Sequence, residues 1–475
     1  MRTALSLSLA ALLCATAQAE PAKTTIPADA VARASALRDA ALKDDTAYAI
    51  VESLTVEIGP RLAGSPNDAR AVAWAEAKFK SLGYDKVWTE PVTYAKWVRR
   101  SESAELVAPF PQKLAITALG GSSSTPTGGL TADIVAFDNL DAFKAADKAK
   151  VKDKIVFIAD RMKAMKDGRD YGRVGKARHE GPAIAQTRGA AAFVMRSVGS
   201  DSDRLPHTGV TDWTLSEGHP LPAAALSTAD ADLLEATLRR GQPVRMKLAL
   251  DCGVEGQYTG ANVIGQINGS THPEQIVAMS GHLDSWDPGT GAIDDGAGVA
   301  IAMAAGHLIA QSKQKPKRSI RVIAFAAEEP GELGGKAYAI AHKDEVARHV
   351  LGSESDFGAG AIWRLRASVK PEAAGAIQQI VQVLAPLGVS FAEGKGEGGS
   401  DLSQMHEIGM AGLSLTQDGM RYFDWHHTAN DTLDKIVPAE LRQNVAVYAA
   451  WGYMAAEAEG DFGSAPGAFA ADSKE

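Results

Sequence analysis

Histidine and carboxylate side chains gather in five short stretches in the C-terminal half of this 475-residue sequence. The stretches are His282-Leu283-Asp284, Asp294-Asp295-Gly296, Glu328-Glu329, Glu354-Ser355-Asp356 and His426-His427. Imidazole nitrogens and carboxylate oxygens are common ligands of divalent transition metals, and a carboxylate also serves as a general base. This set of residue types therefore favours metal-assisted activation of water.

The first two stretches each have a structural and a functional interpretation. Side chains two residues apart on a strand point the same way, so Asp284 can orient the second ring nitrogen of a metal-bound His282. Read alone, such a pair is more often part of a turn. Asp294 and Asp295 open an apolar helical stretch and could serve only as its N-cap. The glycines around them also permit a strained turn that brings one carboxylate between two cations.

The other three stretches are equally ambiguous when each is read alone. Two adjacent glutamates after an apolar strand diverge, so one can bind a metal while the other acts as base, or both are solvated charges. A single acidic residue at a strand end, such as Asp356, is weak evidence for a metal site. Paired histidines favour a metal site about as much as a structural role. Asp431 or Thr432 is expected to cap the helix that follows.

The elements that must position these residues alternate between strand and helix from about 261 to 460. Apolar runs at 276–279 and 320–325 end next to His282 and Glu328, and helices are predicted over 297–309 and 335–342. Such alternation predicts an α/β fold with a mostly parallel sheet covered by helices on both faces. Ligands in these sheets bind at the carboxyl ends of the strands, which is where the charged residues follow.

The N-terminal half divides into two parts. Residues 28–83 are predicted to be helical, with a turn-rich break at 58–66. From about 113 to 252 short β-rich runs alternate with predicted helices at 182–188 and 229–240, which indicates a small α/β unit inserted into the larger one. We therefore predict a signal peptide at 1–19, a catalytic domain at 20–112 and 253–460, an insertion at 113–252, and a disordered tail at 461–475.

The order of the five stretches resembles peptidase family M28, the dinuclear zinc aminopeptidases. The shared motifs are His-x-Asp, Asp-Asp-Gly-x-Gly, Glu-Glu, Ser-Asp and His-x-x-x-Asp-Thr. The residues around these motifs most resemble the carboxypeptidase Q branch of the family. The resemblance covers roughly residues 50–112 and 255–455 and implies a phosphorylase/hydrolase-like fold. It also implies that the insertion is a protease-associated domain.

Residue by residue, the resemblance implies two Zn²⁺ ions per chain. Asp294 would bridge them and be followed by a cis peptide to Asp295; one zinc would take His282 and Asp356, the other Glu329 and His427. Glu328 would be the general base. Some members have a tyrosine before the last histidine ligand, to help hold the oxyanion. Here the position is His426, whose N–H can donate the same hydrogen bond.

The implied activity is hydrolysis of dipeptides or short peptides with free termini. Two alternatives stay open: a glutaminyl cyclase-like enzyme, which uses one zinc, and a non-catalytic binding module. The intact set of five ligands and a base favours hydrolysis.

Composition and the N-terminus bear on partners and location. Arg2, an apolar run and Ala17-Gln18-Ala19 are typical of a secretory signal, so we expect an exported protein, periplasmic or secreted, with no stable membrane anchor. Loss of the leader moves the formal charge from -9 to -10, because only Arg2 is charged in it. This balance argues against nucleic-acid binding. Only Cys252 then remains, so no intrachain disulfide is expected. The sequence does not decide the assembly state, for which a homodimer is one alternative.

Overall fold

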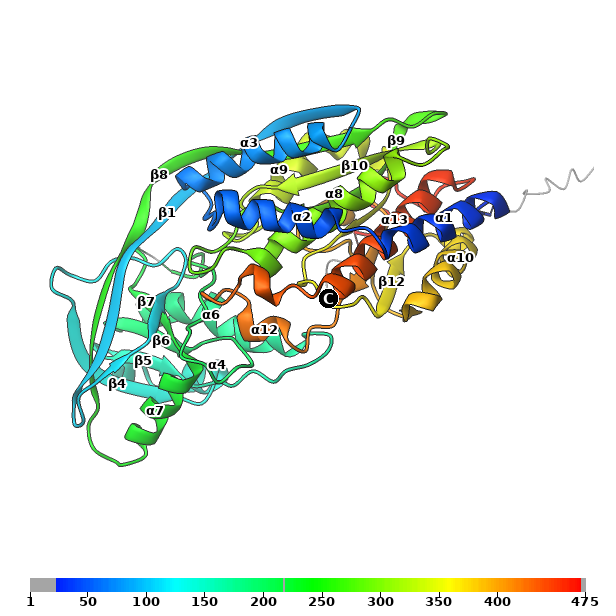
Figure 1. Ribbon diagram of the computed structural model, residues 1–475. Helices are drawn as coiled ribbons and strands as arrows, with labels where there is room; N and C mark the ends of the chain where they lie inside the picture. The colour runs from blue at the N-terminus through cyan, green and yellow to red at the C-terminus, as the bar shows by residue number, and fades with distance from the viewer. Residues whose placement is uncertain (1–22, 217, 471–475) are drawn as a thin grey trace, which may run out of the picture.

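The computed structural model describes residues 23–216 and 218–470, so the predicted leader lies outside the described residues. One sheet runs through two lobes, which Figure 1 shows at its upper right and lower left. Its strand order is β13-β12-β14-β11-β9-β10-β8-β4-β5-β6-β7-β3, and β1 pairs with β8 and β2. The fold class predicted from the sequence is confirmed.

The strands of the first lobe form a mostly parallel sheet. β9 pairs in parallel with β10 and β11, and β11 pairs in parallel with β14, while β12 and β8 join antiparallel. The strands of this lobe are β9 His272–His282, β10 Arg318–Phe325, β11 His349–Glu354, β12 Arg364–Ser368, β13 Ser390–Phe391 and β14 Gly412–Thr416. Its helices are α1 Ala28–Ala41, α2 Thr46–Ser53, α3 Pro66–Ser81, α8 Ala297–Ala310, α9 Leu333–His342, α10 Ala374–Leu384, α11 Ser403–Glu407, α12 Tyr422–Trp425 and α13 Pro438–Glu457.

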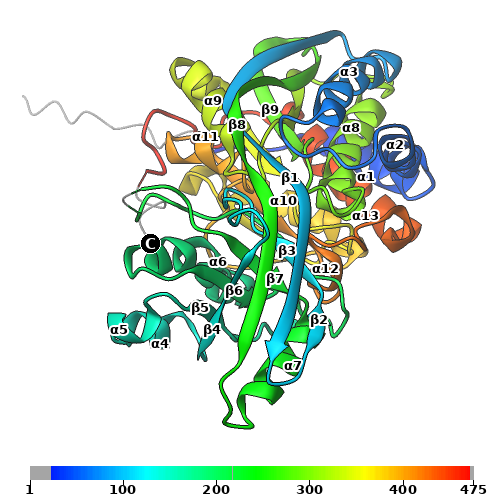
Figure 2. The same cartoon turned by 90° about the vertical axis from the view of Figure 1, so that its left-hand side faces the viewer.

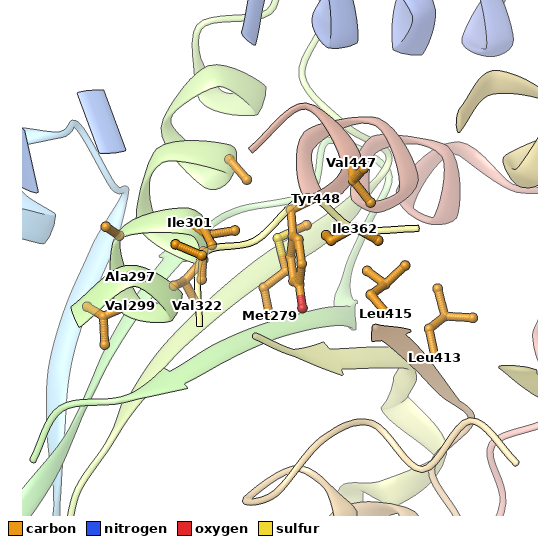
Figure 3. Close-up of a cluster of buried hydrophobic side chains, with 14 of the residues drawn as sticks. Met279, Ala297, Val299, Ile301, Val322, Ile362, Leu413, Leu415, Val447 and Tyr448 are labelled. Carbon is orange, nitrogen blue, oxygen red and sulfur yellow. The ribbon is translucent and has the colours of Figure 1, made fainter. Parts of the chain in front are cut away.

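Successive residues of β9 face opposite sides of the sheet, and both sides are covered. Val277 and Met279 pack in the cluster that contains the apolar sides of α1, α2, α8 and α13. Ile276 and Ala278 belong to the opposite cluster, with Tyr338 of α9 and residues of α11. Figure 3 shows Met279 between Ile301 of α8 and Tyr448 of α13. Burial on both faces explains why the central strands are apolar runs.

Helix α8 is buried on every side. The stretch Ala292–Ala310 is long and apolar enough to cross a membrane by length and composition, but 94% of that window is buried inside the protein. Among the described residues it is the one stretch that passes this test. Its composition therefore reflects the core of the first lobe.

The second lobe has its own parallel sheet. β4, β5, β6 and β7 pair in parallel, and β3 closes the edge antiparallel. The elements are β2 Gln112–Leu114, β3 Ile116–Ala118, β4 Leu130–Phe137, β5 Ile155–Ile158, β6 Ala192–Arg196, β7 Ala223–Leu226, α4 Leu140–Ala145, α5 Lys148–Val151, α6 Asp170–Thr187 and α7 Thr228–Leu238.

Two long antiparallel strands connect the lobes. β1 (Lys86–Ala108) and β8 (Arg245–Ile267) pair along nearly their whole length, and Figure 2 shows them running side by side from one lobe to the other. The sequence places the end of the insertion at residue 252, which lies inside β8. A continuous ribbon thus couples the two lobes mechanically.

Two local predictions need correction. The chain is helical at 182–187 as predicted, but the predicted start is wrong, because this stretch is the last part of α6, which starts at Asp170 and continues through Pro182. Burial of Val174, Ala177 and Ala183 against the second lobe outweighs the cost of an internal proline. The described part of the predicted disordered tail, 461–470, packs instead on the first lobe, since Phe462 is fully buried and the Ser464 hydroxyl donates to the carbonyl oxygen of His349.

Candidate metal centre

The carboxyl ends of three neighbouring parallel strands carry predicted ligands. β9 ends at His282, Glu328 and Glu329 follow β10, and Asp356 follows β11. Because β9 lies between β10 and β11, these side chains meet at one edge of the sheet. His282 and Glu329 are buried, and the side chain of Asp356 is 12% exposed.

Asp294 lies in the turn Ala292–Gly296 that connects this edge to α8. Gly291 before it is left-handed, with φ 61°, and the peptide between Asp294 and Asp295 is cis, as expected. Asp294 Oδ1 lies 3.2 Å from His282 Nε2, and Asp294 Oδ2 lies 3.1 Å from His427 Nε2. One carboxylate thus stands between the two predicted histidine ligands.

Each histidine also faces the carboxylate that was predicted to share its metal. His282 Nε2 is 3.4 Å from Asp356 Oδ1, and His427 Nε2 is 3.1 Å from Glu329 Oε2. The structure therefore brings all five predicted ligands together, in two pairs on either side of Asp294. Asp294 Oδ2 and Glu329 Oε1 are buried and accept no hydrogen bond. Buried carboxylate oxygens without a donor are suited to binding a cation.

The two histidines present the same ring nitrogen to this centre. The Nδ1 of His282 lies 3.0 Å from the carbonyl oxygen of Asp284, and the Nδ1 of His427 lies 3.2 Å from that of Thr208. A carbonyl oxygen can only accept a hydrogen bond, so Nδ1 donates in both rings. Nε2 is therefore the ring nitrogen left for a metal, and it binds one when it carries no proton.

The predicted role of the Asp284 side chain is wrong. Its carboxylate lies 3.8 Å from His282 Nδ1, and the main-chain carbonyl of Asp284 makes the bond instead. The carboxylate accepts hydrogen bonds from the backbone N–H groups of Glu328 (3.0 Å) and Glu329 (3.3 Å). Asp284 therefore positions the two glutamates. The rule of alternating side chains fails because β9 ends at His282.

Of the two adjacent aspartates, Asp295 caps the start of α8, so Asp294 is available to face the metal centre. Its Oδ1 accepts from the N–H of Gly298 at 2.9 Å, and its Oδ2 accepts from the N–H of His282 at 3.0 Å. One carboxylate thus ties the start of α8 to the end of β9. Both Asp295 oxygens are occupied by amides, whereas Asp294 faces the centre.

Two further residues shape the turn that carries Asp294. Asp431 caps no following helix, and its Oδ1 accepts from the N–H groups of Ala292 and Ile293, each at 2.7 Å. Thr432 makes no cap bond either. The fully buried Arg61 donates to the carbonyl oxygens of Leu283, Gly59, Thr290 and Gly291. Sequence reasoning missed Arg61, because an arginine in a turn-rich loop is typical of a solvated side chain.

Glu328 and His426 border the same centre. Burial raises the pKa of Glu328 well above its ordinary value, and the Asp356 and Glu329 carboxylates add to this while His282 opposes it. Glu328 Oε2 lies 3.9 Å from His282 Nε2. Burial and the neighbouring His427 lower the pKa of His426 well below its ordinary value, so this ring is neutral. Its Nε2 lies 3.3 Å from Asp294 Oδ2, and the ring stacks on that of His427.

Ligand-type groups in the described chain can be combined in more than one way. Atoms within 4.8 Å of one another occur in three sets: Asp294 with His426 and His427, His282 with Asp295 and Asp356, and His282 with Asp294 and Glu329. The occupied oxygens of Asp295 make it the weakest ligand of these.

The centre opens into a cavity of about 380 Å³ that both lobes line. From the second lobe come Gly168, Tyr171, Gly172, Arg178, His179 and Val210. Sequence reasoning assigned no site residue to this lobe, because these positions are far along the chain from the ligands and form no motif. A larger hollow of about 940 Å³ lies beside β1 and β8, and none of the predicted ligands borders it.

The second lobe also holds the loop with the paired histidines. The backbone N–H of Thr208 donates to the carbonyl oxygen of His427 at 3.1 Å, and His207 Nδ1 lies 2.7 Å from the carbonyl oxygen of His426. Together with the bond from the His427 ring to Thr208, these contacts tie the main chain of both histidines and the ring of His427 to residues 207–208 of the second lobe.

Comparison with known proteins bears on the family and the fold of the chain. The model of peptidase family M28 matches residues 262–452. Carboxypeptidase Q from Homo sapiens is 32% identical over 87% of this chain and 85% of its own length. The crystal structure of a peptidase M28 precursor from Shewanella amazonensis SB2B superposes with a TM-score of 0.90 at 46% identity, covering 92% of this chain and 99% of that one.

A more distant structure shares the fold alone. A zinc aminopeptidase from Bacillus subtilis matches with a TM-score of 0.61 at 21% identity, over 86% of this chain and 94% of its own. The arrangement of strands around the centre is thus common to proteins whose sequences have diverged widely.

Proposed function

The chain belongs to peptidase family M28 and is a metallopeptidase, and from this premise we propose that it is an exported exopeptidase with two zinc ions that hydrolyses dipeptides and short peptides with free termini. The observation that carries the proposal is the place of Asp294 between two matched pairs, His282 with Asp356 and His427 with Glu329. A carboxylate shared in this way is what a dinuclear site requires.

The residues present fit zinc. All five are histidine or carboxylate, the Nε2 atoms of both histidines face the centre, and two buried carboxylate oxygens lack donors. Zinc held here would polarise the peptide carbonyl and lower the pKa of the attacking water. His282, Glu329, Asp356 and His427 would each belong to one ion and Asp294 to both.

The chain itself supplies the proton transfers. Glu328 accepts a proton from the water as the water oxygen forms its bond to the peptide carbon, and the same carboxyl group delivers that proton to the leaving amine when the C–N bond breaks. His426 donates its ring N–H to the carbonyl oxygen as negative charge develops there. The products are one free carboxylate and one free amine.

The size and enclosure of the cavity support a short substrate. Its volume of about 380 Å³ is near the lower end of the range for small-ligand sites. The second lobe borders it through Tyr171, Arg178 and Val210. We keep the proposal that this lobe is a protease-associated domain, with the role of limiting access to the centre.

The experiment uses zinc-loaded mature protein and a panel of dipeptides and tripeptides with free or blocked ends. Cleavage of free dipeptides, with loss of activity when the ends are blocked, is the expected result. Cleavage of internal bonds in long blocked peptides would contradict the exopeptidase. Cyclisation of N-terminal glutaminyl peptides without hydrolysis would favour the single-zinc alternative, and no turnover at all would favour the binding module.

The location has its own test. Expressed with its complete N-terminus in a Gram-negative host, the protein is expected in the periplasmic or extracellular fraction, with a new N-terminus at Glu20 after the Ala17-Gln18-Ala19 stretch. Full-length protein that stays in the cytoplasm would contradict export.

A further inference from the structure

Arg178, on α6 of the second lobe, borders the cavity with a cationic group that lacks an ionic partner. It is 4% exposed, and among the described residues that line this cavity it is the one lysine or arginine. Its Nη1 reaches the Thr208 carbonyl oxygen and its Nη2 reaches His179 Nε2, both at a long 3.4 Å. Its Nε has no hydrogen-bond partner. No described carboxylate pairs with it.

The surrounding residues hold the guanidinium in place. It lies over the ring of Tyr171, 5.3 Å from the centroid, and Tyr171 stacks on Phe423 next to the paired histidines. A Cβ at Gly209 would lie 2.4 Å from Arg178 Nη1, so the glycine at this position leaves space for the guanidinium. The Thr208 carbonyl oxygen that Arg178 reaches also accepts from His427. The Thr208 carbonyl oxygen therefore links the Arg178 guanidinium to His427, a predicted ligand.

No carboxylate of the cavity forms an ion pair with this cation. Five of them border the cavity, namely Asp294, Glu328, Glu329, Glu332 and Asp356, and none lies within ion-pair distance of the Arg178 guanidinium. His179 does not offset Arg178, because burial together with Arg178 lowers the pKa of His179 to about 4 and the ring is neutral. A buried, unpaired guanidinium is costly unless an anion pairs with it.

We propose that Arg178 binds the free α-carboxylate of the substrate and so makes the enzyme selective for dipeptides, an inference that rests on the proposed exopeptidase function. A planar guanidinium matches a carboxylate with two parallel hydrogen bonds. Each additional residue beyond the cleaved bond moves the terminal carboxylate by about 3.5 Å, which exceeds the tolerance of a hydrogen bond. The position of Arg178 on the second lobe thereby limits how many substrate residues fit between the metal centre and the C-terminus of the substrate.

The test compares a free dipeptide with the same dipeptide as its C-terminal amide. The zinc-loaded wild type is expected to show a kcat/KM for the free acid higher than for the amide by on the order of 10- to 100-fold. Arg178→Met should remove most of that preference, mainly through a higher KM for the acid, and change the amide by less than about threefold. Arg178→Lys should fall between the two, because it keeps the charge but loses the fork.

Arg173→Met is the matched control, since Arg173 lies on the same helix, is half-exposed and pairs with Asp160 and Asp170. It should leave the acid-to-amide ratio unchanged. Zinc content and melting temperature are measured for every variant. Equal losses on acid and amide in Arg178→Met with normal zinc would show a purely structural arginine and overturn the proposal.

If Arg178→Met does not fold, Arg178→Lys and the wild-type ratio still test the proposal. Equal kcat/KM values for acid and amide in the wild type would overturn the role of Arg178 and the need for a free C-terminus, and would leave cleavage at a free N-terminus intact. Absence of cleavage of either substrate by zinc-loaded wild type would instead contradict the proposed function itself.

Discussion

The substitution Glu328→Gln separates a metal-binding centre from a catalytic one. The backbone N–H of Glu328 is fixed by Asp284, and its Oε2 lies 3.9 Å from His282 Nε2. Glutamine keeps the volume, the backbone bond and one carbonyl oxygen. The change therefore removes the proton-accepting carboxylate and leaves the five predicted ligands in place.

The expected loss in kcat is about 10²- to 10⁴-fold, which corresponds to roughly 3 to 5 kcal/mol of activation free energy. Burial raises the pKa of Glu328, so its carboxylate is a stronger base than a solvated glutamate, and zinc ions at the neighbouring ligands would act in the opposite direction. A neutral amide cannot accept the proton at all, so the loss should persist at every pH.

The assay measures kcat on a free dipeptide together with zinc per chain. Glu393→Gln, the same change at an exposed position, is the control and should have no effect. Glu329→Gln should instead lower zinc content, because Glu329 Oε2 faces His427 Nε2 at 3.1 Å. Near-normal turnover in Glu328→Gln with full zinc would refute the assignment of the base.

Two predictions concern stability. In Gly298→Ala the new Cβ would meet the Ser355 carbonyl oxygen and the Asp295 carboxylate, so the free energy of unfolding should fall by about 1 to 3 kcal/mol or more. Gly375→Ala is the control, because Gly375 lies in a helix with open space around it, and it should be neutral or stabilising. Equal melting temperatures of the two variants would contradict this prediction. Burial opposes both shifts in the pair of His342 and Glu90, yet their hydrogen bond lowers the pKa of Glu90 and raises that of His342. The Glu90 contribution is present above pH 4.5 and lost as pH falls through its folded pKa, and that of His342 is present below pH 6.5 and lost as pH rises through its folded pKa. The loss of melting temperature in His342→Gln should therefore be largest between these values and shrink toward pH 9, and a loss independent of pH would contradict the pairing.

The sequence predicted the site best where a potential ligand or base comes directly after an apolar strand. The runs 276–279 and 320–325 become the cores of β9 and β10, and their buried faces explain both their composition and the place of His282 and Glu328 at their ends. The alternation of strand and helix then predicted that these ends meet. Assignment of ligands to individual ions came from the family resemblance and stays a prediction that the observed distances support.

Contacts between distant segments were beyond such reasoning. Arg61 bonds to carbonyl groups more than 220 residues away, and the Thr208 carbonyl that orients His427 comes from another lobe. Main-chain carbonyls carry no sequence signal, which is also why the Asp284 carboxylate was given a role that its own carbonyl performs. Arg178 is recognisable only after folding places it beside the cavity without an ionic partner and with its Nε unbonded.

The metal content of the purified protein tests the central claim most directly. Elemental analysis of protein prepared without chelator is expected to give close to two zinc ions per chain, and Asp294→Ala should lose both, because Asp294 stands between His282 and His427. Circular dichroism would verify that the variant is folded. A stable content of one zinc that Asp294→Ala leaves unchanged would contradict the dinuclear centre.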